Sequence, residues 1–120
     1  MATFNDLCLK DFLVYENPRV IQYHSVHHQL PLEEVQQNFK DLLAWFWLSE
    51  YRLRQGKKTY LFGPLLNLDE LWHTFILHTR DYLFFSQDFF GAYYHHDVEL
   101  PGKEHELSEE ELRDLLHDCF

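Results

Sequence analysis

Imidazole and carboxylate side chains gather in one short part of this chain. Asp69 and His73 lie four positions apart, His78 follows, and the doublet His95-His96 stands further on. Neutral imidazole nitrogens and carboxylate oxygens are ligands that Zn²⁺ and Fe²⁺ accept in proteins. The segment therefore predicts a site for a divalent transition metal. Zinc is the expected ion, and iron is the alternative because two histidines plus one carboxylate also bind non-haem iron.

Aromatic side chains accompany these candidate ligands. Trp72 immediately precedes His73, and Tyr82 follows His78 by four positions. Indole and phenol rings exclude bulk water, and their polar atoms form hydrogen bonds that orient metal ligands. We expect Trp72 and Tyr82 to position the ligands rather than to bind the ion themselves.

Most of the candidate ligands also have a purely structural explanation. With Asn67 as the N-cap, Asp69 and His73 share one face of a helix, but a first-turn carboxylate also complements the helix dipole. His73 stands among apolar residues, where a hydrogen-bonded core histidine is the alternative. In an extended chain His95 and His96 point to opposite sides, so only one of them can face the site. A doublet in a surface loop can also be merely solvated.

The position of His78 depends on whether the helix is continuous. Five residues of helix rotate the chain by roughly 140° and advance it by about 7.5 Å, which separates His78 from His73. Thr79 is a good N-cap and Asp81 favours a first turn, so the chain is expected to bend there and start a new helix. The bend would turn His78 back towards His73. In an unbroken helix Asp69 would complete the ligand set instead.

A second histidine group, His24, His27 and His28, has a spacing of three and four residues. This spacing places the three imidazoles on one helical face, where they could bind a metal. Histidine near a helix C-terminus is also stabilised by the helix dipole. The structural explanation is the preferred one for this group.

The elements that position these residues are predicted to be helices. An all-α single domain of five to six helices is expected over residues 1–120, with the motif at about 50–98. The central helix runs from Pro31 to Gln55 and is aromatic-rich, with an apolar stripe and an apolar belt at 44–48. Its stripe consists of Val35, Phe39, Leu42, Leu43 and Phe46. The other expected helices cover 5–15, a segment opened by Asn17 and Pro18, the 67–90 region, and a tail at about 108–118. A short extended piece is expected at 59–62.

Composition narrows the classes of function. The 120 residues are 46% hydrophobic and 18% aromatic, with a formal net charge of −10. An acidic surface repels phosphate groups, so we expect no nucleic acid and no membrane partner. Only Cys8 and Cys119 are present, which excludes a disulfide framework, and no N-terminal export signal is visible. A cytoplasmic protein is expected, with export by a route that needs no cleaved N-terminal signal as the alternative, and a basic protein partner would suit its charge.

The string Asp69-x-x-Trp72-His73, followed by His78, Tyr82, Gly91 and a His-His doublet, resembles the glycine-rich domain-containing protein-like family. This family is known in plants and has small bacterial relatives, and the resemblance covers about residues 50–98. It implies functional roles for His73, His78, Tyr82 and His96. The plant members carry a second histidine where this chain has Phe75, a proline where it has Thr79, and cysteine near Ser86. The proline implies a helix restart after His78.

Three functions are compatible with these observations. The first is a small metal-binding protein with a histidine-rich site. The second is a metal-dependent enzyme that uses an open coordination position, although the sequence has no HExxH motif, phosphate loop or nucleophile elbow. The third is a protein–protein interaction module in which the histidines are structural. Metal analysis of the purified protein separates the first two functions from the third.

Overall fold

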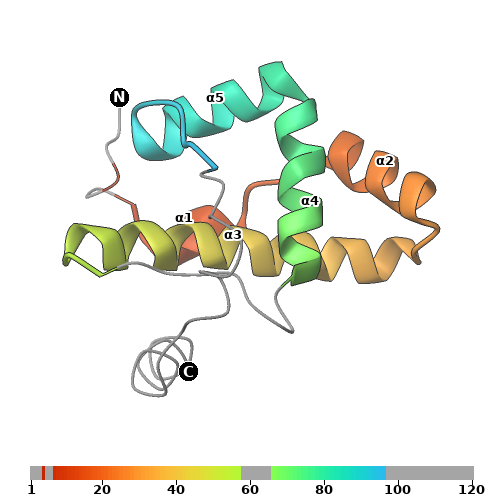
Figure 1. The fold of residues 1–120 in the computed structure, drawn as a ribbon, viewed down its shortest axis with the longest axis horizontal. Coiled ribbons are helices and arrows are strands. Elements are labelled where there is room, and N and C mark those ends of the chain that lie inside the picture. The colour runs from red at the N-terminus through yellow and green to blue at the C-terminus, as the bar shows by residue number, and fades with distance from the viewer. Residues whose placement is uncertain (1–3, 5–6, 58–65, 97–120) are drawn as a thin grey trace, which may run out of the picture.

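The computed structural model describes residues 4, 7–57 and 66–96. Within these ranges the chain forms five α-helices and no strand, which confirms the all-α prediction. The helices are α1 (Leu9–Leu13), α2 (Pro18–His28), α3 (Leu32–Arg54), α4 (Leu66–Leu77) and α5 (Thr79–Phe90). The long α3 runs along the base of the molecule, α4 crosses it, and α5 leaves the far end of α4 (Figure 1). The predicted tail helix and the extended piece at 59–62 lie outside the described residues.

The central helix agrees closely with its sequence signals. Pro31 is the N-cap and Gln55 the C-cap of α3, so the prediction of a helix between these two residues is confirmed. Acidic side chains occupy its first turn and arginines its last turn, which complements the helix dipole at both ends. No helix in the described part of the chain is long and apolar enough to cross a membrane.

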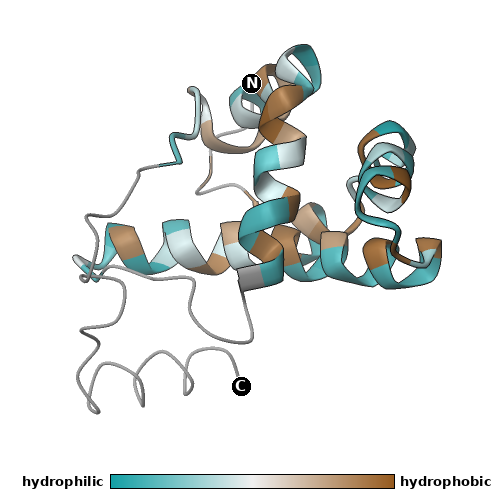
Figure 2. Cartoon of the chain, turned by 45° about the vertical axis from the view of Figure 1, so that its right-hand side comes forward, coloured by the Kyte–Doolittle hydropathy of each residue, from teal (hydrophilic) through white to brown (hydrophobic). Residues whose placement is uncertain are grey.

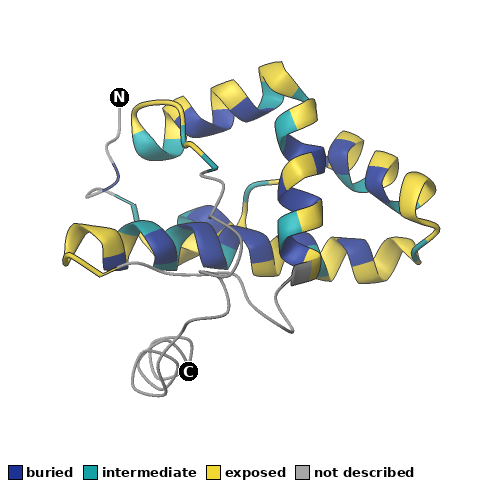
Figure 3. Cartoon of the chain, in the orientation of Figure 1, coloured by how far each residue is buried: buried dark blue, intermediate teal, exposed yellow. Residues whose placement is uncertain are grey.

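The core lies where α3 meets the other helices. All five residues of the predicted apolar stripe are buried. Polar and apolar residues alternate around each helix (Figure 2), and the buried residues form bands along one side of it (Figure 3). The apolar belt at 44–48 is only partly buried. Trp45 and Phe46 are buried, whereas Trp47 is half-buried and its ring stacks on the exposed Tyr51, so one side of the belt faces outward.

The N-terminal helices differ from the prediction in extent. The Asn17 side chain accepts a hydrogen bond from the Val20 N–H, which confirms Asn17 as the cap of α2. However, α1 is only five residues long rather than the predicted eleven. A helix this short presents one side to the core, so Phe12 is fully buried while Leu9 and Leu13 are each 37% exposed.

The bend predicted near residue 78 is present. Helix α4 ends at Leu77 and α5 begins at Thr79, with His78 between them at φ −84° and ψ 70°. His78, not Thr79, is the N-cap of α5, and its carbonyl accepts a hydrogen bond from the Tyr82 N–H. The start of α4 also differs from the prediction. The helix includes Leu66, so Asn67 lies inside its first turn rather than at the N-cap.

Candidate metal site

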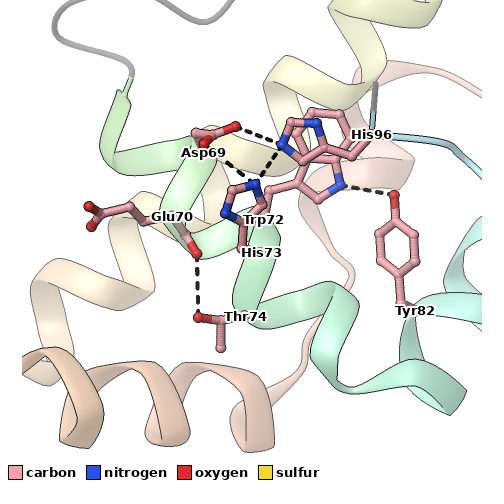
Figure 4. A network of polar contacts seen from close by, with 7 residues as sticks. All are labelled: Asp69, Glu70, Trp72, His73, Thr74, Tyr82 and His96. Carbon is pink, nitrogen blue, oxygen red and sulfur yellow. Dashed lines mark hydrogen bonds and ion pairs between the residues drawn. The ribbon is translucent and has the colours of Figure 1, made fainter. Parts of the chain in front are cut away.

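Three of the predicted ligands meet at one point, and we refer to Asp69, His73 and His96 as the triad (Figure 4). Asp69 and His73 project from successive turns of α4, and His96 comes from the irregular segment after α5. His96 Nε2 lies 2.6 Å from Asp69 Oδ1 and 3.0 Å from His73 Nε2. His73 Nε2 is 3.5 Å from Asp69 Oδ2. One carboxylate and two imidazoles therefore direct their ligand atoms at a common centre.

These separations match the spacing of ligands around a single ion. Bonds of about 2.0–2.1 Å to Zn²⁺ place tetrahedral ligand atoms roughly 3.3 Å apart. An octahedral ion with similar bonds places adjacent ligand atoms about 3.0 Å apart. His96 Nε2 lies 2.6 Å from Asp69 Oδ1 and 3.0 Å from His73 Nε2, at or below the octahedral value, and His73 Nε2 lies 3.5 Å from the second carboxylate oxygen, Oδ2. Each of the three residues offers one ligand atom within 4.8 Å of the other two, so the triad can hold a metal ion.

The triad is open on one side. The exposed fraction of the side chain is 17% for His96, 31% for Asp69 and 59% for His73. His73 is therefore not the core histidine that its apolar neighbours suggested. Helical geometry explains the difference, because Trp72 and Phe75 turn into the core on either side of His73 in the sequence and leave it facing outward.

His96 is held against the protein by aromatic contacts. Its ring stacks on Trp72 with centroids 3.9 Å apart and an interplanar angle of 10°. The Trp72 indole N–H donates a hydrogen bond of 2.9 Å to the Tyr82 hydroxyl, and this hydroxyl donates to the Tyr94 carbonyl. Tyr82 is fully buried, and burial raises the pKa of its phenol well above the usual 10.0. The phenol therefore keeps its proton and acts as a hydrogen-bond donor at any physiological pH.

Tyr94 also helps to hold His96 in place, although it was not among the predicted site residues. Its hydroxyl donates to Ser49 Oγ at 3.0 Å, which ties the His96 segment to α3. Its ring also stacks on Phe90 with centroids 4.0 Å apart. The sequence contained a signal for this role of Tyr94, because in an extended chain residues 94 and 96 point to the same side. A tyrosine two positions before a ligand therefore packs on the same surface as that ligand.

Two predicted ligands, His78 and His95, lie outside the triad. His78 Nδ1 donates a hydrogen bond of 3.0 Å to the Thr74 carbonyl, and its ring meets the edge of Tyr23. The bend at His78 therefore exists but does not turn the imidazole towards His73. His95 is exposed and contacts the ring of Tyr93. This arrangement agrees with the expectation that only one member of the doublet faces the site.

The second histidine group is a packing cluster in the structure. His24 is buried, its Nδ1 lies 2.7 Å from Thr74 Oγ1, and its ring packs at a tilt against that of His28. Burial lowers the pKa of His24, and the neighbouring His28 lowers it further. His27 instead packs on Tyr23. Within the described residues, the triad is the only group of three acidic, histidine or cysteine side chains with metal-binding geometry.

The fold and the site define a small all-α protein with a surface group of two histidines and one carboxylate. The chain belongs to the UCP032817-like family, whose model matches residues 9–117. No curated protein and no solved structure matches the chain. The match does not bear on the resemblance to the glycine-rich domain-containing protein-like family, which stays a prediction.

Proposed function

We propose that this protein binds one divalent transition metal ion through Asp69, His73 and His96. The observation that supports the proposal is the convergence of Asp69 Oδ1 and the two Nε2 atoms, with His96 Nε2 within 3.0 Å of both others. Zinc is the expected ion, because it accepts imidazole and carboxylate together. Iron(II) is the alternative, because the same three ligand types form the facial site of non-haem iron proteins.

A hydrogen-bonded cluster explains the triad less well than a metal does. His96 Nε2 carries either a proton, which it can donate to Asp69 at 2.6 Å, or a lone pair, which can accept from His73 at 3.0 Å, so it cannot satisfy both contacts. His73 is well exposed, and a solvated imidazole gains little from an ion pair at 3.5 Å. Even so, its Nε2 turns towards the two other ligand atoms. A cation at the centre would satisfy all three atoms at once.

The open side of the triad favours an ion that keeps a water molecule. Structural zinc sites usually have four protein ligands, whereas catalytic zinc sites have three and leave one position to solvent. Among the described residues three ligands converge, and His73 faces the solvent. An enzyme that activates this water is therefore the second candidate function. The metal would supply the Lewis acidity, and the chain would supply the ligands and the Trp72 surface on which His96 rests.

The test is direct metal analysis of protein purified without a histidine tag. We expect close to one equivalent of zinc or iron, or the uptake of one equivalent by metal-free protein in calorimetry. His73→Ala, His96→Ala and Asp69→Asn should each abolish tight binding. His95→Ala is the matched control, because this neighbouring imidazole lies outside the triad, and it should leave binding unchanged.

Acidification supplies a further check on the proposed site. Imidazole must be neutral to bind a metal, so affinity should fall as the pH drops through about 6. The proposal is wrong if the purified protein holds under about a tenth of an equivalent and shows no thermal shift on metal addition. The triad would then be a structural cluster, as in an interaction module.

A further inference from the structure

Of the three triad residues, His96 is the only one whose backbone lies outside a helix. Asp69 and His73 are fixed relative to each other by one turn of α4. His96 lies in the irregular segment that follows Gly91, where no helix or strand holds the backbone. Its position must therefore come from side-chain contacts with the rest of the domain.

We propose that Tyr82 is the positioning residue for His96. Its hydroxyl accepts the hydrogen bond from Trp72 Nε1 and donates one to the Tyr94 carbonyl (Figure 4 shows the first of these). Trp72 forms the surface on which the His96 ring stacks, and Tyr94 fixes the backbone two residues before His96. The Tyr82 hydroxyl thus holds both the Trp72 ring beneath His96 and the backbone at Tyr94. The inference rests on the proposed metal site and assigns Tyr82 a role in it.

Only a tyrosine at this position supplies both contacts. A phenol donates and accepts through a single oxygen, whereas phenylalanine of the same shape does neither. The ring of Tyr82 is held edge-on by Phe75, so the hydroxyl has a fixed position between α4 and the His96 segment. Without the hydroxyl, the Trp72 N–H and the Tyr94 carbonyl lose their shared partner. Removing it should therefore move His96 while leaving Asp69 and His73 in place.

The test compares Tyr82→Phe with Tyr93→Phe in Zn²⁺ calorimetry. The Tyr93 ring also contacts Tyr82 but is 41% exposed, so this variant is the matched control. We expect Tyr82→Phe to weaken Zn²⁺ binding about tenfold or more, the usual cost of losing a group that orients a ligand. In a His96→Ala background the same change should have no further effect. Tyr93→Phe should bind like the unchanged protein.

A second readout needs no metal. The protons of the His96 ring lie over the Trp72 indole, so ring current shifts their NMR resonances in the metal-free protein. Tyr82→Phe should move these resonances towards those of an unstacked histidine, and Tyr93→Phe should not. If Tyr82→Phe does not fold, Trp72→Phe removes the N–H donor and keeps a ring beneath His96. It should then weaken Zn²⁺ binding relative to the unchanged protein, and equal binding by a folded Trp72→Phe variant would refute the role of this hydrogen bond.

The outcomes separate the inference from the proposed function. If the unchanged protein binds Zn²⁺ and Tyr82→Phe binds equally well with unmoved His96 resonances, the positioning role is wrong and the metal site stands. If the unchanged protein binds no metal, the proposed function fails, and the His96 resonances decide alone whether Tyr82 positions this ring. A folded Tyr82→Phe protein with lower thermal stability, unchanged affinity and unmoved resonances would show a structural role only.

Discussion

Truncation of two adjacent aromatic residues in α3 should have very different effects on stability. Phe46 is fully buried and its ring contacts other aromatic rings from α3, α4, α5 and the His96 segment. These rings belong to Trp45, Trp72, Phe75, Phe85, Phe90 and Tyr94. Replacing a buried phenylalanine with alanine costs about 3–5 kcal/mol when the neighbouring side chains do not fill the cavity. We expect Phe46→Ala to cost about 4 kcal/mol, because rigid rings on several elements cannot close the cavity.

Trp47→Ala is the internal comparison. Trp47 is half-buried, and its ring stacks on Tyr51 at 5.1 Å, but Tyr51 is itself 45% exposed. An aromatic pair adds about 0.5–1.5 kcal/mol beyond the area that it buries, and Trp47 packs only partly against the core. We therefore expect a loss of about 1–2 kcal/mol. Although tryptophan is the larger side chain, its removal should cost at most about half as much as the removal of Phe46.

Equilibrium unfolding in urea measures both losses. The midpoint should fall much further for Phe46→Ala than for Trp47→Ala, with similar slopes for the two variants. Phe46 also contacts both Trp72 and Tyr94, so its truncation should weaken metal binding by the triad, whereas truncation of Trp47 should not. Equal losses of stability, or a loss below about 2 kcal/mol for Phe46→Ala, would refute this account of the core.

Two further predictions concern the α4–α5 corner and the buried histidine. Thr79→Pro should change the free energy of unfolding by less than about 1 kcal/mol, because Thr79 is the first residue of α5, where proline is accepted; a loss near 3 kcal/mol in urea unfolding would indicate a continuous helix. Burial lowers the pKa of His24 below the usual 6.5, so the unfolded chain takes up this proton first and stability should fall as pH drops below about 6.5. Melting curves from pH 7.5 to 5 should show a shallower decline for His24→Gln, whereas His27→Gln should retain the decline of the unchanged protein.

Local sequence signals predicted the helices well. Asn17 and Pro18 specify the start of α2, and Pro31 that of α3, because capping and proline geometry act within a few residues. Boundaries that depend on packing were less predictable. Asn67 has the chemistry of an N-cap, yet α4 includes the residue before it.

Helical spacing predicted only the part of the site that lies within one element. The pairing of Asp69 with His73 follows from helical spacing alone. The choice of His96 over His78 depends on tertiary contacts, because the stacking on Trp72 joins residues 24 positions apart. The bend at His78 was predicted correctly, but the direction of its imidazole was not, because the competing Thr74 carbonyl lies one turn back on the same helix.

The single-residue corner at His78 has a consequence for how the length of this chain can vary. Between Asp69 and Tyr82 the backbone is helical except at His78 itself. One inserted or deleted residue in a helix rotates everything beyond it by about 100°. Such a change between Trp72 and Tyr82 would swing the phenol away from the indole, and a change between Asp69 and His73 would separate the two ligands. The interval from 69 to 82 thus has a fixed length, whereas the irregular turn at 55–57 can lengthen without altering either pairing.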